Sequence, residues 1–452
     1  MKLKGDKKMK KENFLIGFFL LFLFTPNIRS EELLPDLFIT TADFSNSDVT
    51  LSKALPKGGD KITIRAKIHN KGETSCSDIT VCFFREDRTK KTIPIGGKHT
   101  IEKIEPDKFV MLTQEWLVPK NGFYKIIVVI DPDNKIKEKD KNNNKCYFEV
   151  PVVSKELHFH YWACPKSTRY VTIKMFSKKN EEKEYWENRG VIPAAWRGGV
   201  CQGKYGWNEE EQFINYWGTV ITSGYPAIAI DEFIEGNPIC KIMFSALIKT
   251  KEKFPNLLIT LATPGLSGSE ESADAYRKAA DLVLIERYFS SFIMYYGFNT
   301  QWEMAKKMGI ADKTLFTLGL SITEQSWITT EQELLRQIKY IKKLAPEMNG
   351  LSFFGWTTEH LYESIDNAIF AYYIKPVIWI KSISSDKATI TNIGGMDAEN
   401  IGIEIFSEEP KKGGERIDLK KIEFLKVGEE KTIEISSKYL SVVPSEHYTI
   451  LE

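Results

Sequence analysis

The chain has 452 residues, of which 42% are hydrophobic and 27% charged, and its formal net charge is +1 at pH 7. That length allows for about three domains of ~150 residues each. The composition is that of a globular protein and excludes a fibrous or largely disordered chain. Without residues 1–30, which hold seven Lys/Arg and two Asp/Glu, the chain has 62−7=55 basic and 61−2=59 acidic residues, so nothing in it indicates a nucleic-acid surface.

The N-terminus has the layout of a secretory signal. A basic segment, residues 1–13, precedes the apolar run Phe14–Phe24, and a short polar exit, Thr25–Ser30, follows it. The apolar run is shorter than the ~20 residues that a membrane-spanning helix needs. We therefore predict that residues 1–30 are a signal peptide and that the protein is secreted, extracellular or in the cell envelope. The alternative is an uncleaved N-terminal anchor.

Residues 31–153 are predicted to form an all-β domain. One run alternates apolar and polar side chains and puts Ile62, Ile64, Ala66 and Ile68 on one face. Similar alternation recurs in later runs, and turns rich in Gly, Pro and Asp separate them. Regular short strands with such turns indicate an immunoglobulin-like β-sandwich.

Four segments of this domain resemble the CARDB family, a cell-adhesion-related domain of prokaryotic surface proteins. They are PDL (35–37), IHNKG (68–72), IEPDK (104–108) and the run from Gly122 to Asn144 with its Asp-Pro-Asp-Asn turn. The resemblance implies a β-sandwich used for presentation or adhesion, without a catalytic role. It also implies a component of the cell envelope as a partner.

Eight short apolar runs follow one another within residues 154–376, and most gaps between them are long enough for a helix. Alternating strands and helices predict a parallel sheet, and eight repeats over this length fit a closed (β/α)8 barrel, the TIM barrel. The first gap is too short for a helix, which predicts an irregular start. The predicted strands are residues 157–163, 170–176, 190–196, 227–231, 257–263, 282–288, 314–322 and 351–356.

Residues 377–452 contain a weaker copy of the first domain. Asn392 and Gly394 align with Asn70 and Gly72, and the apolar residues that follow lie at the same offsets in both copies. The copy ends before any Asp-Pro-Asp-Asn turn, so we predict a second Ig-like sandwich that is divergent or truncated. The predicted architecture is therefore an α/β barrel flanked by two all-β domains.

Acidic side chains follow two of the predicted barrel strands. Strand four ends in Asp231 and Glu232, and strand six ends in Glu286. Catalytic residues of such barrels lie at the C-terminal ends of the strands. Glycoside hydrolysis requires two carboxyl groups across a cleft, one to protonate the leaving oxygen and one to attack the sugar carbon or activate water. We predict Asp231 and Glu286 as this pair, with Glu232 as substitute and Glu324 in reserve.

Aromatic residues at the strand ends favour a carbohydrate ligand. Tyr161, Trp196, Tyr288 and Trp356 lie near the ends of strands one, three, six and eight. Sugar rings present C–H faces that stack on aromatic rings, so we predict these four as substrate-binding residues. The alternative is that some of them pack in the barrel wall, since aromatic side chains are also common in cores.

Two cations complete the predicted substrate-binding residues. Lys174 lies on strand two and could bind a substrate carboxylate, and Arg197 follows the end of strand three. A structural alternative exists for the arginines, because Arg197 or Arg287 could pair with the acidic residues and orient them. Such ion pairs would favour a binding protein over an enzyme.

No metal and no cofactor are predicted. His158 and His160 share a face of strand one, and together with Asp231 they would suggest a metal-dependent hydrolase. Apart from His360, no further histidine lies near a strand end, so a core or hydrogen-bonding role fits the pair better.

The barrel resembles those of glycoside hydrolases in which a hydrophobic fourth strand ends in an acidic pair. The resemblance implies hydrolysis of a glycosidic bond in a polysaccharide or glycoconjugate, with a carbohydrate as partner and no nucleic acid. The alternative is a non-catalytic surface protein, for adhesion or glycan binding, built on the same barrel. We expect a monomer.

Overall fold

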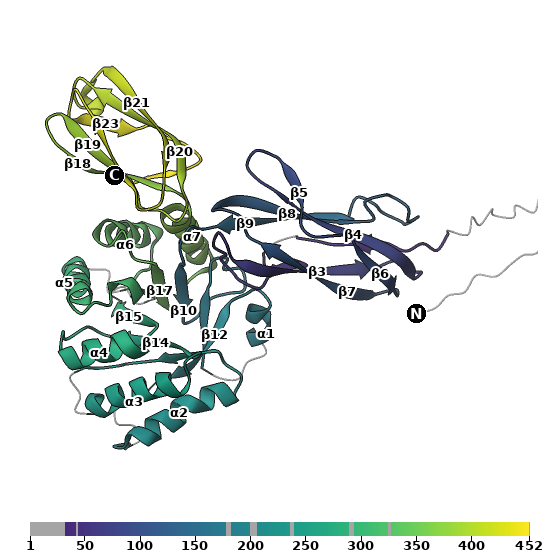
Figure 1. Ribbon diagram of the computed structural model, residues 1–452, viewed down its shortest axis with the longest axis horizontal. Helices are drawn as coiled ribbons and strands as arrows, with labels where there is room; N and C mark the ends of the chain where they lie inside the picture. Colours follow the sequence, from purple (N-terminus) through teal and green to yellow (C-terminus); the bar gives the residue numbers. More distant parts are fainter. Residues whose placement is uncertain are drawn as a thin grey trace, which may run out of the picture.

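The structure of the protein is a computed structural model with a closed barrel between two β-sandwiches (Figure 1). The fold class predicted from the sequence is therefore confirmed. The predicted signal peptide lies outside the described residues, and no described helix is long and apolar enough to cross a membrane. The described residues are 32–41, 44–177, 182–198, 206–235, 239–288, 293–323 and 327–451.

Antiparallel sheets form the N-terminal sandwich. β3 (Lys61–Asn70) pairs along its whole length with β7 (Lys108–Leu117). Its alternating side chains give it one face for the core and one for solvent, and the inward ones are at most 4% exposed. The other strands are β1 (Leu37–Phe38), β2 (Val49–Leu51), β4 (Cys76–Glu86), β5 (Thr92–Pro94), β6 (His99–Ile104), β8 (Gly122–Ile130) and β9 (Lys145–Val152).

Eight parallel strands close into the barrel in chain order, and the last pairs with the first to complete the ring. Nearly all their side chains are buried, because each faces either the barrel interior or the surrounding helices. The strands are β10 (His158–Tyr161), β11 (Ile173–Phe176), β12 (Ile192–Arg197), β13 (Ala227–Ile230), β14 (Leu258–Thr263), β15 (Leu282–Arg287), β16 (Thr314–Leu320) and β17 (Gly350–Gly355).

Helices follow each barrel strand except the first. Residues 162–172, between β10 and β11, form no helix, as their short span predicted. Thr330 starts α6 because its hydroxyl accepts a hydrogen bond from the backbone N–H of Glu333 at 3.3 Å. The helices are α1 (Glu182–Glu187), α2 (Glu210–Thr222), α3 (Cys240–Lys253), α4 (Glu270–Ala279), α5 (Ile293–Lys307), α6 (Glu331–Leu344) and α7 (Glu359–Ile369).

The C-terminal region also folds as two sheets, with strand orders β22-β19-β18-β24 and β21-β20-β23. β24 runs parallel to β18, whereas all described strand pairs of the N-terminal sandwich are antiparallel. The strands are β18 (Val377–Ile383), β19 (Lys387–Asn392), β20 (Ala398–Phe406), β21 (Arg416–Leu425), β22 (Glu430–Glu434), β23 (Tyr439–Val442) and β24 (Thr449–Leu451).

A buried asparagine ties three chain segments together in the N-terminal sandwich. The Asn70 side-chain amide donates hydrogen bonds to the carbonyl oxygens of Thr74 at 2.8 Å and Ile104 at 3.1 Å. Its oxygen accepts from the backbone N–H groups of Asp36 at 3.1 Å and Gly72 at 3.0 Å. One side chain thus satisfies four backbone groups that would otherwise be buried without partners.

Asn392 repeats this arrangement in the C-terminal sandwich. Its amide donates to the carbonyl oxygens of Met396 at 2.8 Å and Leu425 at 3.1 Å. Its oxygen accepts from the N–H groups of Val377 and Gly394, both at 3.1 Å. The match of all four bonds supports the internal repeat that the sequence alignment indicated.

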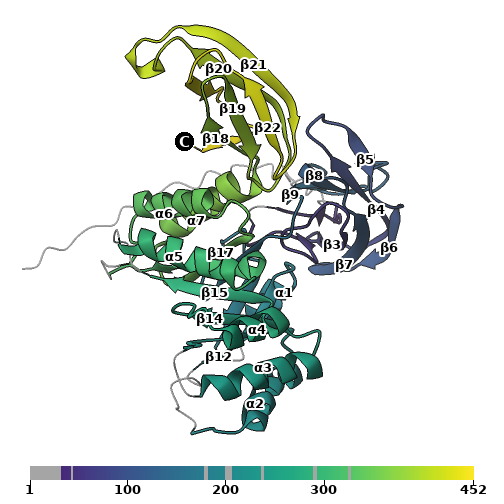
Figure 2. The same ribbon diagram turned by 60° about the vertical axis from the view of Figure 1, so that its left-hand side comes forward.

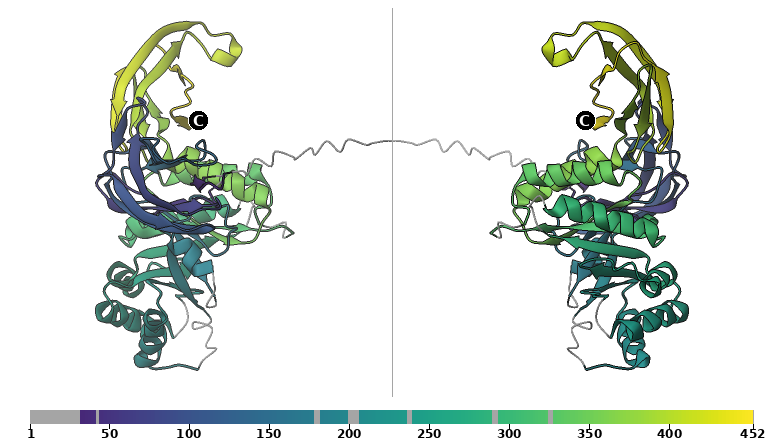
Figure 3. Two further views of the ribbon diagram at one scale, coloured as in Figure 1. Left: turned by 90° about the vertical axis from the view of Figure 1, so that its right-hand side faces the viewer. Right: turned by 90° about the vertical axis from the view of Figure 1, so that its left-hand side faces the viewer.

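The three regions are packed against one another, and α7 lies where they meet (Figures 1 and 2). Asn121 and Asp397 join the two sandwiches: the asparagine amide donates to Oδ2 at 3.0 Å and its oxygen accepts from the aspartate N–H at 2.9 Å. Leu55 and Val153 belong to the hydrophobic core of the barrel. Figure 3 shows the yellow C-terminal sandwich above the green helices of the later barrel half.

Replacing Asn392 by Ala should destabilise the C-terminal sandwich strongly. The change leaves four buried backbone groups without partners, so we expect a loss of about 3 kcal/mol or more in the free energy of unfolding. Urea denaturation followed by circular dichroism measures the loss. Asn208→Ala, at an exposed position, is the matched control and should cost under about 0.5 kcal/mol. Equal stability of the two variants would contradict the role of Asn392.

Candidate active site

Side-chain direction at the mouth of the barrel follows from strand register. The guanidinium of Arg197 lies 5.2 Å from the Tyr216 ring of α2, outside the barrel, so Trp196 before it faces the interior. Residues paired across parallel strands face the same side of the sheet. The pairing of β12 with β13 therefore puts Asp231 on the interior side, beside Trp196. The pairings of β13 with β14 and of β14 with β15 put Glu286 on the same side.

Asp231 lies one residue beyond β13, at the mouth. Its Oδ2 accepts a hydrogen bond from Nε1 of Trp196 at 3.0 Å. Burial raises the pKa of Asp231, and the like charge of Glu232 raises it further, whereas the bond from Trp196 lowers it. The indole thus holds the carboxylate in one orientation and stabilises its charged form.

Glu286 lies near the end of β15, with its carboxyl half-buried. Burial raises the pKa of Glu286 to about 7. A short hydrogen bond from the Tyr288 hydroxyl to Oε1 opposes the rise, and the negative charges of Asp231 and Glu232 add to it. A carboxyl with this pKa carries a proton in a large fraction of molecules at neutral pH.

Glu232 turns the chain out of the barrel. Its φ of +56° is in the left-handed region, which a non-glycine residue adopts at a cost. The N–H of Phe233 then donates to the carbonyl of Ala262 at 2.8 Å, which fixes the turn. Glu232 therefore lies beside the pair as a third half-buried acid, whereas Glu324 lies outside the described residues.

Aromatic rings form one wall of the mouth beside Glu286. The Tyr288 ring stacks on Phe354, with 5.0 Å between centroids and 21° between planes, and lies 4.9 Å from the Trp327 ring. Trp162 meets Phe354 edge-on at 5.2 Å. Of these four, only Tyr288 is among the substrate-binding residues predicted from the sequence. Phe354 could have been found from its inward position two residues before Trp356, but Trp327 lies in a loop without periodic signal.

Trp356 is the most exposed tryptophan at the mouth. It lies just beyond β17 and is 61% exposed, which is unusual for so large an apolar side chain. Ile322, beyond β16, is 62% exposed. The rim around the acidic residues thus carries apolar side chains that are open to a ligand.

The arginines turn away from the acidic residues. Arg197 donates to the carbonyl oxygen of the residue before it at 2.8 Å, and Arg287 donates to that of Pro264 at 2.7 Å. Within the described ranges, neither forms an ion pair with Asp231 or Glu286. The prediction of Arg197 as a substrate-binding residue is therefore not supported, and the orienting role considered for both arginines is not found.

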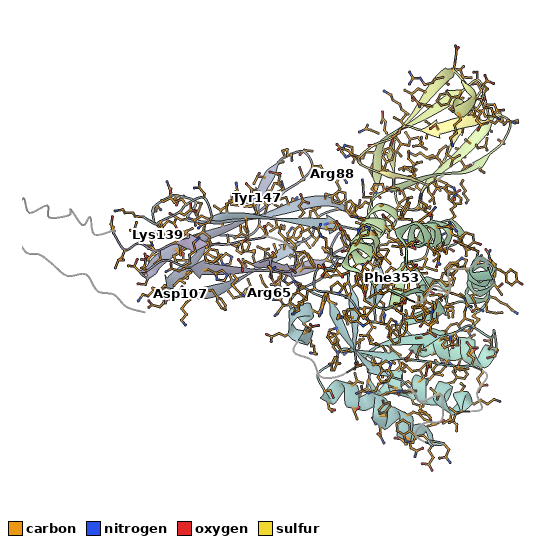
Figure 4. The ribbon with its side chains drawn as sticks, turned by 180° about the vertical axis from the view of Figure 1, so that it is seen from behind. Arg65, Arg88, Asp107, Lys139, Tyr147 and Phe353 are labelled. Carbon is orange, nitrogen blue, oxygen red and sulfur yellow. The ribbon has the colours of Figure 1, made fainter. Side chains whose placement is uncertain are left out.

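Tyr161 and Lys174 do not reach the mouth either. Register pairs them with each other on the outward side of β10 and β11. Tyr161 is fully buried, and its ring stacks on Phe353, its register partner in β17, with centroids 4.8 Å apart; Figure 4 labels Phe353 in the barrel domain. Nζ of Lys174 lies 5.4 Å from the Trp186 ring of α1. We therefore remove both from the predicted substrate-binding residues.

His160 points into the barrel and makes a structural contact. Its Nδ1 lies 3.4 Å from the Ser352 hydroxyl. Full burial lowers the pKa of His160 to about 3, so the ring is neutral. In the part of the chain that the structure describes, no group of three His, Cys, Asp or Glu residues is arranged to hold a metal ion.

The geometry defines a barrel protein with an acidic, aromatic-lined mouth and two attached sandwiches. Residues 34–148 match the CARDB family, so the first sandwich is a CARDB domain. It is similar to the CARDB domain of a Pyrococcus furiosus protein in complex with di-metal ions, with 21% identity over 26% of this chain and 90% of that chain and a TM-score of 0.21. No curated protein matches the chain.

Glycoside hydrolases are among the structural neighbours. Bacteroides uniformis β-glucuronidase 2, covalently bound to cyclophellitol-6-carboxylate aziridine, is 10% identical over 89% of this chain and 59% of that chain, with a TM-score of 0.35. A Paenibacillus sp. cycloisomaltooligosaccharide glucanotransferase, complexed with cycloisomaltoheptaose, is 11% identical over 60% and 52%, with a TM-score of 0.32.

Replacing Glu286 by Gln should change how stability depends on pH. The pKa of this acid is about 7 in the folded state, and its ordinary value is 4.5. Between these two pH values the folded state therefore holds a proton that the unfolded state has released. Wild-type stability then falls as pH rises from about 4.5 to 7, and the variant lacks this loss. We expect the variant to gain up to about 3 kcal/mol relative to wild type across this window.

Urea denaturation of the barrel at about pH 4.5 and pH 7.5 measures the effect. Glu303→Gln on α5, whose side chain is 67% exposed, is the control. A Glu286→Gln variant that behaves like this control would contradict the raised pKa.

Proposed function

We propose that the barrel hydrolyses a glycosidic bond in a polysaccharide or glycoconjugate. The observation that carries the proposal is the pair Asp231 and Glu286. Both point into one mouth, each accepts a hydrogen bond from an aromatic side chain, and no described arginine neutralises either. Two carboxyl groups in unequal environments are the requirement for acid and base roles.

Glu286 is the proton donor in this proposal. A general acid must hold its proton near the working pH and release it to the leaving oxygen. With its pKa raised to about 7 by burial, Glu286 meets both conditions. After transfer, the Tyr288 hydroxyl donates its hydrogen bond to the newly charged carboxylate, which stabilises the product of the step.

Asp231 is the carboxylate on the other side of the scissile bond. The hydrogen bond from Trp196 favours its charged form, so it can attack the sugar carbon or activate a water. The first route gives retention of configuration at that carbon and the second gives inversion. Glu232 is the substitute if Asp231 only orients the site.

The aromatic wall and the apolar rim provide the contacts for sugar rings. Tyr288 and Phe354 present stacked rings beside the acid, with the Trp327 ring tilted against Tyr288, and Trp356 is open to solvent above β17. Such surfaces suit the C–H faces of sugars, while the carboxyl groups suit their hydroxyls.

The CARDB domain supports a location at the cell surface or outside the cell, with a component of the cell envelope as its partner. The predicted signal peptide at residues 1–30 agrees with that location. We propose both as the setting in which the barrel meets its glycan.

Glu286→Gln and Asp231→Asn should each lower turnover by at least ~100-fold, the usual scale for a positioned acid or base. Wild-type activity should also fall as pH rises above about 7, because Glu286 loses its proton there. Release of reducing ends from a panel of polysaccharides identifies the substrate and measures both effects. Proton NMR of the first-formed anomer separates retention from inversion.

Glu303→Gln, away from the mouth, is the control and should keep full turnover. Full turnover in Asp231→Asn would bring forward Glu232 as its substitute. Binding of a polysaccharide without release of reducing ends would instead favour the non-catalytic glycan-binding protein.

A further inference from the structure

A cavity lies between the CARDB domain and the barrel. Its volume is about 1000 Å³, and it runs between β9 and α7, which Figures 1 and 2 show near one another. Pockets of this size are at the upper end of those that hold ligands. We call it the interdomain cleft.

The cleft adjoins the candidate active site. Its lining includes Tyr362 of α7, whose hydroxyl donates to the carbonyl oxygens of Ala163 at 3.2 Å and Gly355 at 3.4 Å. These carbonyls lie where β10 and β17 end, next to Trp162 and Trp356. A linear polymer that leaves the mouth over this side of the barrel would reach the cleft.

The two walls of the cleft are held in place. The carboxylate of Asp366, only 8% exposed, accepts hydrogen bonds from the N–H groups of Arg169 at 2.9 Å and Tyr170 at 3.4 Å, which fixes the loop on the barrel side. Across the junction, the Arg189 guanidinium donates to the carbonyl oxygen of Ser45 at 2.7 Å. The cleft is therefore formed before any ligand arrives, which lowers the entropic cost of binding.

Aromatic rings and charged groups of both signs line the cleft. The Tyr170 ring stacks on Phe370 with planes 13° apart, and Phe123 of β8 lies 5.4 Å from the same ring. Tyr147 of β9 is 46% exposed, and Figure 4 shows it on the CARDB domain, between Lys139 and the barrel. The charged side chains of the lining are Glu149, Glu359, Glu363, Asp366, Arg169 and Arg189.

This lining suits an uncharged polyhydroxyl chain better than an anion or a peptide. The three exposed carboxyl groups of the lining, those of Glu149, Glu359 and Glu363, outnumber its two guanidinium groups and disfavour phosphate or an acidic polymer. A peptide strand would need the free edge of β9, where Pro151 has no N–H to donate. Sugars use both features of the cleft, since rings stack on their C–H faces and carboxylates accept from their hydroxyls.

We propose that the interdomain cleft binds a further segment of the neutral polysaccharide that the barrel cleaves. The inference rests on the proposed function of the barrel and extends it to a substrate class, a long uncharged glycan. The CARDB domain then contributes a wall to the substrate path.

The test uses the full chain with Glu286→Gln, so that ligand is held and not cleaved. Into this background we introduce Tyr147→Ala with Glu363→Ala, one exposed residue from each wall of the cleft. The matched control carries Tyr296→Ala with Glu303→Ala on α5, where Tyr296 is 74% exposed. The probes are microcrystalline cellulose, chitin, xylan, mannan and starch, with bound fractions measured by sedimentation.

We expect at least one of these five polysaccharides to retain the Glu286→Gln protein. The cleft variant should lose about tenfold in affinity for it, a change equivalent to ~1.4 kcal/mol, and the control should lose none. Retention on none of the five, or equal retention of cleft variant and control, would overturn the proposal.

Release of reducing ends by the otherwise wild-type chain separates this inference from the proposed function. Cleft-dependent binding without any release would leave the cleft site standing and remove the hydrolase. Release whose KM is the same with and without the cleft substitutions would leave the hydrolase standing and remove the cleft site.

Discussion

The alternation of side chains in a closed parallel barrel decides what this protein can do. Neighbouring strands of the ring share one register, so the inward or outward direction of one residue fixes that of its partners around the barrel. The side chains of Asp231 and Glu286 point into the barrel, whereas those of Arg197 and Arg287 point outward. A shift of one residue at β15 would put the Arg287 guanidinium in the mouth and remove the carboxyl of Glu286 from it.

Burial then makes the two inward acids unequal. Both lose hydration, which favours their neutral forms, and both accept a hydrogen bond that favours the charged form. Burial outweighs the bond from Tyr288 at Glu286 and brings its pKa to about 7. Burial also raises the pKa of Asp231, and the hydrogen bond from the Trp196 indole opposes that rise. Register thus places one aromatic donor beside each acid, where the donor offsets part of the effect of burial.

The sequence predicted the elements of this site better than their directions. Apolar runs and long gaps are enough to count the barrel strands, and acids at two strand ends stand out among them. The strand limits were the weak point: β10 ends at Tyr161 rather than two residues later. Tyr161 pairs with Lys174 of β11, and both side chains lie on the outward face, away from the mouth. Trp327 reaches the aromatic wall from the loop between β16 and α6, and no pattern in the sequence predicts the path of that loop.

The sequence also did not predict that the CARDB domain packs on the barrel. The side of the barrel at β10 and β11 nevertheless has to be covered. Residues 162–172 form no helix between β10 and β11, so this side lacks the layer that covers the other strands. Leu55 and Val153 enter the barrel core instead. At Gly190 the approach is so close that a Cβ would lie 2.4 Å from the backbone N of Lys53. A domain held this tightly is part of the barrel's own core, and its surface is therefore available to shape what the barrel binds.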